Sequence, residues 1–337
     1  MPVYNGATYL DDAIDSILAQ DFRDFEFVIV DDGSTDTTPK ILARRAAADS
    51  RIVIVRNERN LGIARALNRG LDVARGEYVA RQDADDLSEP GRFRAQVDVL
   101  DRNPDVALVS TNYHLIDERG NILQTTKLNH PSKLIAYLLN FSNILGGHSQ
   151  VMFRADLIRE LGAYSNEYTI SQDYDLWTRV VRRARIVVLR QPGMRYRLHD
   201  SRITVRRRDR QVEESWSITR RMLTEYLGRP LRDDELEAIA SSWRQHIPSS
   251  RPDLAHAIAA EAFALFARTH DRDLQRRARL VTSQRFAITG AAMIRYGYLM
   301  TGLRFLTVSL RWSVLGVPRV FVQGLMMTWR KFRAMRS

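Results

Sequence analysis

The stretch FEFVIVDDGSTD, residues 25–36, decides the fold class of this chain. Apart from Glu26, its first six residues are aromatic or β-branched, which predicts a buried strand, and the Asp, Gly and Ser residues that follow predict a turn. Helices are expected on either side, over residues 10–18 and about 37–48. A strand between two helices predicts one unit of an α/β fold.

The same alternation continues along the chain. Further strands are expected at residues 52–55, 77–80 and 106–109, and further helices at about 63–74 and 90–100. This spacing predicts right-handed βαβ units and a Rossmann-like, mostly parallel sheet with helices on both faces. Ligands of such sheets bind at the carboxyl ends of the strands, so functional side chains are expected there.

Two acidic clusters stand at such strand ends. Asp83, Asp85 and Asp86 follow the strand expected at 77–80, and their carboxylates repel one another unless a cation lies between them. Mg²⁺ and Mn²⁺ prefer carboxylate and phosphate oxygens, which favours a metal site; the alternative is a solvated acidic loop that caps the next helix. The cluster at residues 31–36 predicts either local turns or carboxylates that hold a nucleobase or ribose.

The composition excludes several kinds of site. The chain has 337 residues and no cysteine, so disulfides, zinc–thiolate sites and cysteine nucleophiles are absent. Its first residues lack the basic stretch and apolar run of a signal peptide, and we therefore expect the protein in the cytoplasm. His114, His130 and His148 show no metal-ligand spacing, and scattered histidines are usually surface or core residues.

The excess of positive charge lies at the C-terminal end. The net charge is +11, and residues 271–337 hold 13 of the 51 Lys and Arg residues but 2 of the 40 Asp and Glu residues. Residues 286–310 are mostly apolar, yet arginines interrupt every window long enough for a membrane span. An anionic partner is therefore expected to meet this end of the chain.

The arrangement of these arginines favours a membrane surface. On a helical wheel, the four positions Arg285, Arg295, Arg304 and Arg311 fall within one half of the circumference. This predicts an interfacial helix on anionic lipid, and a second basic stretch at 329–336 continues the pattern. The alternatives are a helix that packs on the preceding domain with a basic outer face, and nucleic-acid binding, for which no motif is present.

Nine short motifs follow one another over about 200 residues. They are Pro2-Val3-Tyr4-Asn5-Gly6, Ser16-Ile17-Leu18-Ala19-Gln20, Asp31-Asp32-Gly33-Ser34-Thr35-Asp36, Asn60-Leu61-Gly62 with Asn68, Gly76-Glu77-Tyr78-Val79, Asp83-Ala84-Asp85-Asp86, His148-Ser149-Gln150-Val151-Met152-Phe153-Arg154, Gln172-Asp173-Tyr174-Asp175-Leu176-Trp177 and Tyr196-Arg197-Leu198-His199. In this order they resemble the family 2 glycosyltransferases, whose nucleotide-sugar-binding fold is called GT-A.

The resemblance implies where the donor binds. Pro2, Tyr4 and Asp32 match positions that hold the nucleotide base, usually uracil, and Arg65 lies where some relatives approach the nucleotide. The donor is accordingly expected to be a UDP-sugar.

The cluster after the fourth strand matches the D-x-D element of the family. Asp83 and Asp85 are implied to contact the diphosphate, Asp85 and Asp86 to bind Mn²⁺ or Mg²⁺, and His199 to lie on the diphosphate side of the site.

Asp173 matches the catalytic base. In an inverting transfer the acceptor hydroxyl loses a proton as it attacks the anomeric carbon, and a carboxylate within hydrogen-bond reach accepts it. Gln172 and His148 are possible substrate-site residues by the same resemblance. The alternative for Asp173 and Asp175 is favourable placement of a negative charge in the first turn of a helix.

The chain departs from the family in three places. Gln172 precedes the base where the family has Glu. The apolar strand that normally precedes Pro-x-Tyr-Asn is missing, so we expect the natural start to lie upstream or the chain to be truncated. The Gln-x-x-Arg-Trp element of processive relatives is absent, which favours single addition over polymer synthesis.

These observations predict three regions: a GT-A domain over residues 1–205, a helical region over 206–270 and basic amphipathic helices over 271–337. The expected activity is that of an inverting, metal-dependent hexosyltransferase. It moves a sugar to a glycan or lipid-linked acceptor for surface polysaccharide or glycolipid synthesis, at the inner face of the cell membrane and without a nucleic-acid partner. The rivals are a non-catalytic nucleotide-sugar-binding or membrane scaffold protein, and a nucleotidyltransferase, whose basic phosphate loop is not found.

Overall fold

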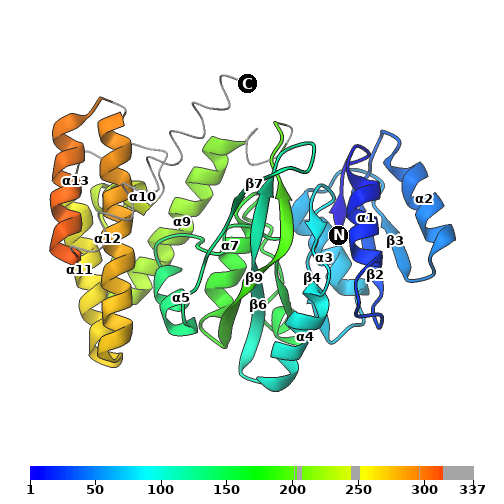
Figure 1. The fold of residues 1–337 in the computed structure, drawn as a ribbon, viewed down its shortest axis with the longest axis horizontal. Coiled ribbons are helices and arrows are strands. Elements are labelled where there is room, and N and C mark those ends of the chain that lie inside the picture. Colours follow the sequence, from blue (N-terminus) through cyan, green and yellow to red (C-terminus); the bar gives the residue numbers. More distant parts are fainter. Residues whose placement is uncertain (201, 203–206, 244–250, 296, 314–337) are drawn as a thin grey trace. The chain divides into compact units, whose positions relative to one another are not determined.

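The structure is a computed structural model that describes all residues except 201, 203–206, 244–250, 296 and 314–337. The stretch at 329–336, for which an interfacial helix is predicted, lies outside the described residues. The chain forms two compact units, which are considered separately (Figure 1). The first unit comprises residues 1–136 and 143–215, and the second comprises 137–142 and 216–337.

The first unit begins with a parallel sheet of three strands, which is one part of the predicted sheet; the strands expected at 77–80 and 106–109 lie instead in a second, mixed sheet. The strands of the first sheet have the order β1-β2-β3, with Val3 opposite Asp31 and Asp31 opposite Arg56. Ile29 and Val30 of the central strand are buried, as expected for a strand covered on both faces. The elements are β1 (Pro2–Val3), α1 (Leu10–Leu18), β2 (Phe27–Asp31), α2 (Thr38–Ala48), β3 (Ile52–Arg56) and α3 (Ile63–Val73).

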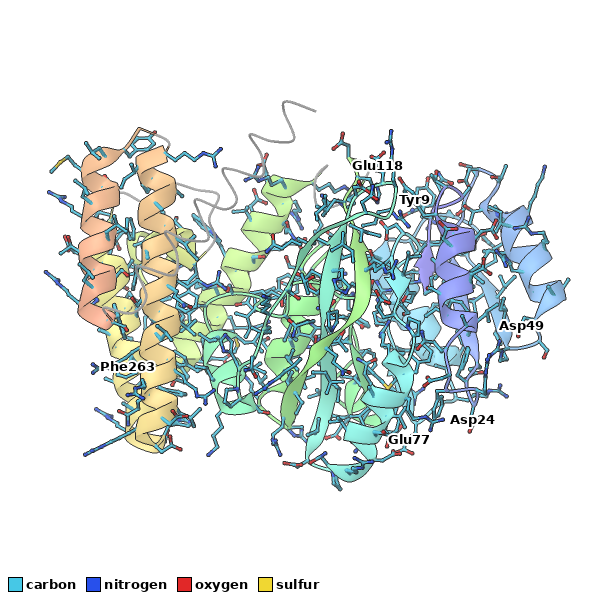
Figure 2. All side chains as sticks on the ribbon, in the orientation of Figure 1. Tyr9, Asp24, Asp49, Glu77, Glu118 and Phe263 are labelled. Carbon is cyan, nitrogen blue, oxygen red and sulfur yellow. The ribbon has the colours of Figure 1, made fainter. Side chains whose placement is uncertain are left out.

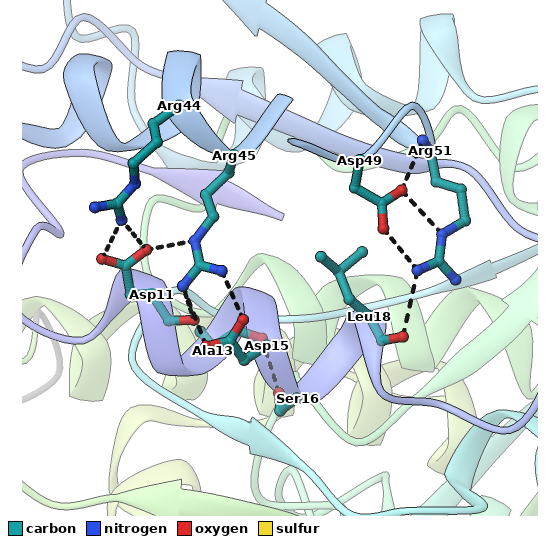
Figure 3. A network of polar contacts seen from close by, with 9 residues as sticks. All are labelled: Asp11, Ala13, Asp15, Ser16, Leu18, Arg44, Arg45, Asp49 and Arg51. Carbon is teal, nitrogen blue, oxygen red and sulfur yellow. Dashed lines mark hydrogen bonds and ion pairs between the residues drawn. The ribbon is translucent and has the colours of Figure 1, made fainter. Parts of the chain in front are cut away.

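Ion pairs join α1 to α2 at the surface (Figure 3). Arg44 Nη2 and Arg45 Nε lie 2.6 and 2.5 Å from Asp11 Oδ1, and Arg45 Nη1 lies 2.7 Å from Asp15 Oδ1. Exposed pairs of this kind contribute about 0–1 kcal/mol each, so the apolar face of α1 contributes more to this packing. That face consists of Leu10, Ala13, Ile14 and Ile17, all buried.

A second sheet of six strands completes the first unit. Its order is β4-β8-β6-β9-β5, with β7 on β6. The β6–β9 pair is parallel, whereas β8 lies antiparallel to both β4 and β6. The elements are β4 (Tyr78–Ala80), β5 (Leu87–Ser88), α4 (Arg92–Arg102), β6 (Val106–Ile116), β7 (Ile122–Thr125), α5 (Ser132–Leu138), β8 (Met152–Arg154), α6 (Ala155–Glu160), α7 (Gln172–Val180) and β9 (Arg185–Arg197).

No strand pairing joins the two sheets in the described part of the chain. Strand β1 has two residues, and it pairs with β2 alone. A cavity of about 760 Å³ is lined by residues of both sheets, including Phe27, Val30, Tyr78 and Met152. Apolar side chains of β2 and β4 therefore border a common space at this point.

The second unit is helical. The last two helices that the structure describes lie side by side as a hairpin (Figure 1). They approach at Gly290 and Gly302, where a Cβ built on either glycine would lie 2.7–2.8 Å from the carbonyl oxygen of the other. Phe286, Phe305 and Trp312 are buried in this hairpin. No described helix is both long enough and apolar enough to cross a membrane. The helices are α9 (Arg208–Leu227), which begins in the first unit, α10 (Asp233–Trp243), α11 (Pro252–Thr269), α12 (Arg272–Arg295) and α13 (Leu299–Trp312).

Candidate active site

The loop after β4 gathers the predicted acidic cluster around one hydroxyl group. Ser149 Oγ lies 2.7 Å from Asp83 Oδ2 and 2.7 Å from Asp86 Oδ2, and it accepts the backbone N–H of Asp83 at 3.0 Å. Arg81 Nη2 donates to Asp83 Oδ1 at 2.6 Å. Ser149 and Arg81 thus hold Asp83 from both of its oxygens. Sequence reasoning assigned no role to either residue.

The Asp86 side chain is buried in the protein interior. Ser149 has one hydroxyl proton, so its two short carboxylate contacts together require a proton on one carboxyl group. Asp86 is 1% exposed, and its burial, with Asp85 and Asp83 nearby, raises the pKa of Asp86 well above its usual range. Its Oδ1 accepts the backbone N–H of Arg197 at 3.0 Å. Both oxygens of Asp86 are thus engaged by protein groups, whereas the Asp85 side chain is 34% exposed; metal binding by either residue stays a prediction.

Asp85 presents its carboxylate to solvent. Its side chain is 34% exposed, and Oδ2 lies 2.9 Å from His199 Nε2. The His199 ring packs against Tyr9, at 5.3 Å between ring centroids, and the Arg197 guanidinium lies 4.5 Å from the Tyr9 ring. Arg197 also donates to the backbone oxygen of Glu118 (Tyr9 and Glu118 are labelled in Figure 2). Asp85 and His199, which the sequence analysis named separately, are therefore in contact, with Asp85 the more exposed of the two.

The donor set of this loop suits a metal that arrives with its substrate. The described part of the chain holds no group of three or more His, Asp or Glu side chains that could bind an ion alone. Mg²⁺ is usually held by one or two carboxylates together with substrate phosphates, and it keeps several waters. The exposed carboxylate of Asp85 fits such a site.

Asp32 organises the edge of the first sheet. Its Oδ1 accepts hydrogen bonds from Asn57 Nδ2 at 2.7 Å and from the Leu61 N–H at 2.9 Å, and Oδ2 accepts the Gly62 N–H at 2.9 Å. It is 4% exposed. Asp32 therefore fixes the loop between β3 and α3, and a nucleobase would be held by the one remaining lone pair, on Oδ2.

The other predicted donor residues lie at the same edge. Pro2 pairs with Val30 in β1 and β2, and the N–H of Asp32 donates to the Val3 oxygen at 2.8 Å, which sets the residues after β1 beside Asp32. Tyr4 follows β1 and is 49% exposed. Arg65 is exposed in the first turn of α3. Aromatic and cationic side chains thus remain accessible near a buried carboxylate.

Asp173 lies in the first turn of α7, in a buried but polar setting. Its side chain is 9% exposed; Oδ2 accepts Asn143 Nδ2 at 2.9 Å and Oδ1 accepts the backbone N–H of Tyr174 at 2.7 Å. Burial raises the pKa of Asp173 to about 6, although both hydrogen bonds act in the opposite direction. Gln172 is also buried, and its Oε1 has no hydrogen-bond partner within the described residues. Asp175 instead pairs with Arg179 at 2.8 Å.

Electrostatics connects Asp173 to the loop after β4. The pKa of Asp173 is shifted mainly by burial, but the Arg81 guanidinium also lowers it and the Asp83 carboxylate raises it. Arg81 is 3% exposed. The buried Arg81 guanidinium and the partly exposed Asp83 carboxylate are therefore close enough to Asp173 to influence its charge, so the predicted base lies within electrostatic reach of the D-x-D element.

His148 lies behind Asp83 and faces the interior. Arg81 Nε donates to His148 Nδ1 at 3.3 Å, and His148 Nε2 lies 2.9 Å from the Tyr164 hydroxyl. Burial lowers the pKa of His148 well below its ordinary value, so the ring is neutral. Because Nδ1 is an acceptor, Nε2 carries the proton and donates to Tyr164. In this geometry His148 positions Arg81, while a direct contact with substrate stays a prediction.

Two further residues that sequence reasoning missed support the site. Glu214 accepts the N–H groups of Thr169, Ile170 and Ser171 at 2.8–2.9 Å, and it thereby fixes the turn that leads into α7 and Asp173. Arg92 is fully buried and donates to the Arg81 backbone oxygen at 2.8 Å. A lone Glu or Arg in a helix with charges of both signs carries no sequence signal for either role.

Comparisons with known proteins show which proteins this chain resembles. Residues 1–162 match the model of the family described as Glycosyl transferase family 2. An uncharacterized glycosyltransferase of Haemophilus influenzae is 29% identical over 67% of this chain and 72% of its own length. The chain spans less than two thirds of the length of several other curated glycosyltransferases that it matches.

Solved structures share the fold. S. aureus TarS in complex with UDP-GlcNAc has a TM-score of 0.55 and 17% identity, and the match covers 92% of this chain and 89% of that one. The mannosyltransferase PcManGT of Pyrobaculum calidifontis, in complex with GDP-Man and Mn²⁺, has a TM-score of 0.53 and 19% identity over 92% of this chain and 85% of that one. Both likenesses are to the fold, which confirms the α/β architecture expected from the sequence.

Proposed function

We propose that the chain, whose residues 1–162 match the model of glycosyltransferase family 2, transfers a sugar from a UDP-sugar to a hydroxyl group of a glycan or lipid-linked acceptor, with inversion at the anomeric carbon. The observation that supports this proposal is the buried Asp173 carboxylate, which Asn143 and the Tyr174 N–H orient and whose pKa is influenced by Asp83 of the D-x-D element.

Asp173 acts as the general base. As the acceptor oxygen forms its bond to the anomeric carbon, the bond from that carbon to the diphosphate oxygen breaks, and the hydroxyl proton passes to Asp173. Burial holds the pKa of Asp173 at about 6, which is nearer to neutrality than that of an ordinary Asp and makes the carboxylate a better proton acceptor. Asn143 and the Tyr174 N–H leave one lone pair of each oxygen free, and they fix the direction in which the carboxylate accepts.

The nucleotide sugar binds at the edge of the first sheet and at the loop after β4. Tyr4 and Asp32 hold the nucleotide base, and Asp85, with His199 beside it, faces the diphosphate. A divalent cation, Mn²⁺ or Mg²⁺, would be held by Asp85 together with the diphosphate oxygens, and when bound it would offset the negative charge of the leaving group. Arg81 keeps Asp83 in place and supplies a fixed positive charge behind the loop.

We further propose a setting for this reaction. The product belongs to a surface polysaccharide or glycolipid, and the protein works at the inner face of the cell membrane. The support is the resemblance of the motifs for the product, and the excess of basic residues over 271–337 for the membrane.

The test is a transfer assay with a panel of nucleotide sugars, glycan and lipid-linked acceptors, and Mn²⁺ or Mg²⁺. Wild type is expected to turn over a UDP-sugar in a metal-dependent manner, and Asp173→Asn to lose about 10²–10⁴-fold in kcat. The control is Asp156→Asn, because Asp156 lies on α6 of the same unit and is 98% exposed. Nucleotide binding without turnover across the panel would favour a scaffold protein.

A further inference from the structure

The outer face of α13 is the largest concentration of exposed apolar side chains in the described part of the chain. Of ten exposed large hydrophobic residues, five lie between residues 298 and 310. They are Tyr298 (52% exposed), Leu299 (55%), Met300 (67%), Leu303 (44%) and Leu310 (48%). Scattered exposed hydrophobics are normal, but a run of five on one hairpin marks an interaction surface.

These side chains form a stripe because of their helical spacing. At about 100° per residue, Leu299, Leu303 and Leu310 fall within roughly 40° of one another on the circumference of α13. The opposite side of the same helix carries Phe305, Val308 and Trp312, which are buried against α11 and α12. The leucine stripe is therefore not needed for the packing of the second unit.

Positive charge borders the stripe. Arg304 and Arg311 are exposed and lie within about 20° of each other, roughly 100° further round the helix. Arg295, also exposed, ends α12 at the same turn of the hairpin. From residue 274 to 337 the sequence contains no Asp or Glu, so nothing in this segment offsets these charges.

We propose that the outer face of α13, with Leu299, Leu303 and Leu310 as its apolar stripe and Arg304 and Arg311 at its border, is a surface that docks on an anionic lipid bilayer. Apolar side chains enter the boundary between headgroups and acyl chains, and arginines beside them reach the lipid phosphates. The following segment, residues 314–337, carries basic residues and no acid, so it offers no charge complementary to Arg304 and Arg311. An extended positive surface suits a continuous sheet of anionic lipid.

This inference assigns the membrane contact of the proposed function to named residues, and its test needs neither donor nor acceptor. Full-length protein is sedimented with vesicles of phosphatidylcholine alone or with added phosphatidylglycerol. Wild type is expected to bind the anionic vesicles and to lose binding in high salt. The variant Leu299→Ser/Leu303→Ser/Leu310→Ser should bind at least tenfold more weakly, and each of Arg304→Gln and Arg311→Gln about fivefold more weakly.

The first unit offers a matched control. Ile122 and Leu123 on β7 are 53% and 48% exposed, so Ile122→Ser/Leu123→Ser removes comparable apolar surface elsewhere. This variant should bind vesicles like wild type. Far-ultraviolet circular dichroism and thermal melts of each variant verify that it folds, which is expected because every substituted side chain is exposed.

The lack of cysteine permits a second, local measurement. A single Leu303→Cys, labelled with an environment-sensitive dye, should shift to shorter emission wavelength on anionic vesicles, whereas labelled Ile122→Cys should not. The proposal would be overturned if wild type did not bind anionic vesicles. It would also be overturned if the leucine variant bound as tightly as wild type, which would assign the contact to another segment. A third contradicting result would be a dye on Leu303→Cys that responds to an added protein but not to lipid. Activity on a soluble acceptor is measured separately, so the proposed reaction can fail or hold independently.

Discussion

The free energy of unfolding of Asp173→Asn, measured relative to that of wild type, should increase as the pH rises. The pKa of Asp173 is raised from 3.8 to about 6, so the folded state holds the proton more tightly than the unfolded state does. The stability that this gives is fully present below pH 3.8 and is lost as the pH rises to about 6. A shift of this size corresponds to about 3 kcal/mol in the free energy of unfolding, and Asn has no such dependence.

The amide also changes the hydrogen bonds. Asn at this position can accept from Asn143 or from the Tyr174 N–H but must turn its NH₂ toward the other donor, at a cost of about 1–3 kcal/mol. This cost does not depend on pH. The informative quantity is therefore how the difference in unfolding free energy between the two proteins changes with pH. All other groups titrate in both proteins, so their contributions cancel in this difference.

The measurement is urea denaturation of wild type and Asp173→Asn at a series of pH values from about 3.5 to 8. The difference in unfolding free energy should move by about 3 kcal/mol in favour of the variant, with its midpoint between the two pKa values. Wild-type kcat/KM should rise with pH and level off above about 6, because the base must be ionised. A stability difference that stays constant across this range would refute the assignment of a raised pKa to Asp173.

Three other perturbations separate the parts of the site. Glu214→Gln should lower the free energy of unfolding by about 2–3 kcal/mol, because one carboxylate holds three backbone N–H groups; thermal melts measure it, and an unchanged melting temperature would contradict the role. Gly33→Ala should destabilise by at least about 2 kcal/mol more than Gly120→Ala: both glycines have positive φ, but a Cβ at Gly33 would lie 2.5 Å from backbone, whereas Gly120 has open space. Asp85→Asn should weaken metal-dependent nucleotide binding at least tenfold in calorimetry while Asp156→Asn does not, and equal affinities would exclude Asp85 as the metal ligand.

The elements with strong local patterns could be predicted from sequence. The strand and turn at residues 25–36 are found as β2 and the loop after it, because apolar alternation and turn residues act locally. Strand β8 could not be predicted in the same way, since three residues are too few to show a period. Its antiparallel position between β4 and β6 depends on pairing over long sequence separations.

In the candidate site, too, some residues could be proposed from the sequence and others could not. Asp85 and Asp173 could be proposed from the sequence because a carboxylate at a known place in a motif is a local signal, and their roles stay predictions. The inward position of Asp86 could not, since it depends on Ser149 and on the backbone of Arg197, more than sixty and one hundred residues away. Arg81 was missed because an arginine at the end of a strand usually reaches solvent, whereas this one is 3% exposed.

The close approach of α12 and α13 at Gly290 and Gly302 has a thermodynamic consequence. Many interfacial helices are coils in water, and they lose conformational entropy of about 1 kcal/mol or more per residue when a surface orders them. Here α13 is already ordered by its contact with a neighbouring helix. The entropy is therefore lost when the protein folds, and not when it binds to the membrane. Circular dichroism of the protein should accordingly show no gain in helix from α13 when vesicles are added, and the leucine stripe can meet a lipid surface as a preformed, rigid face.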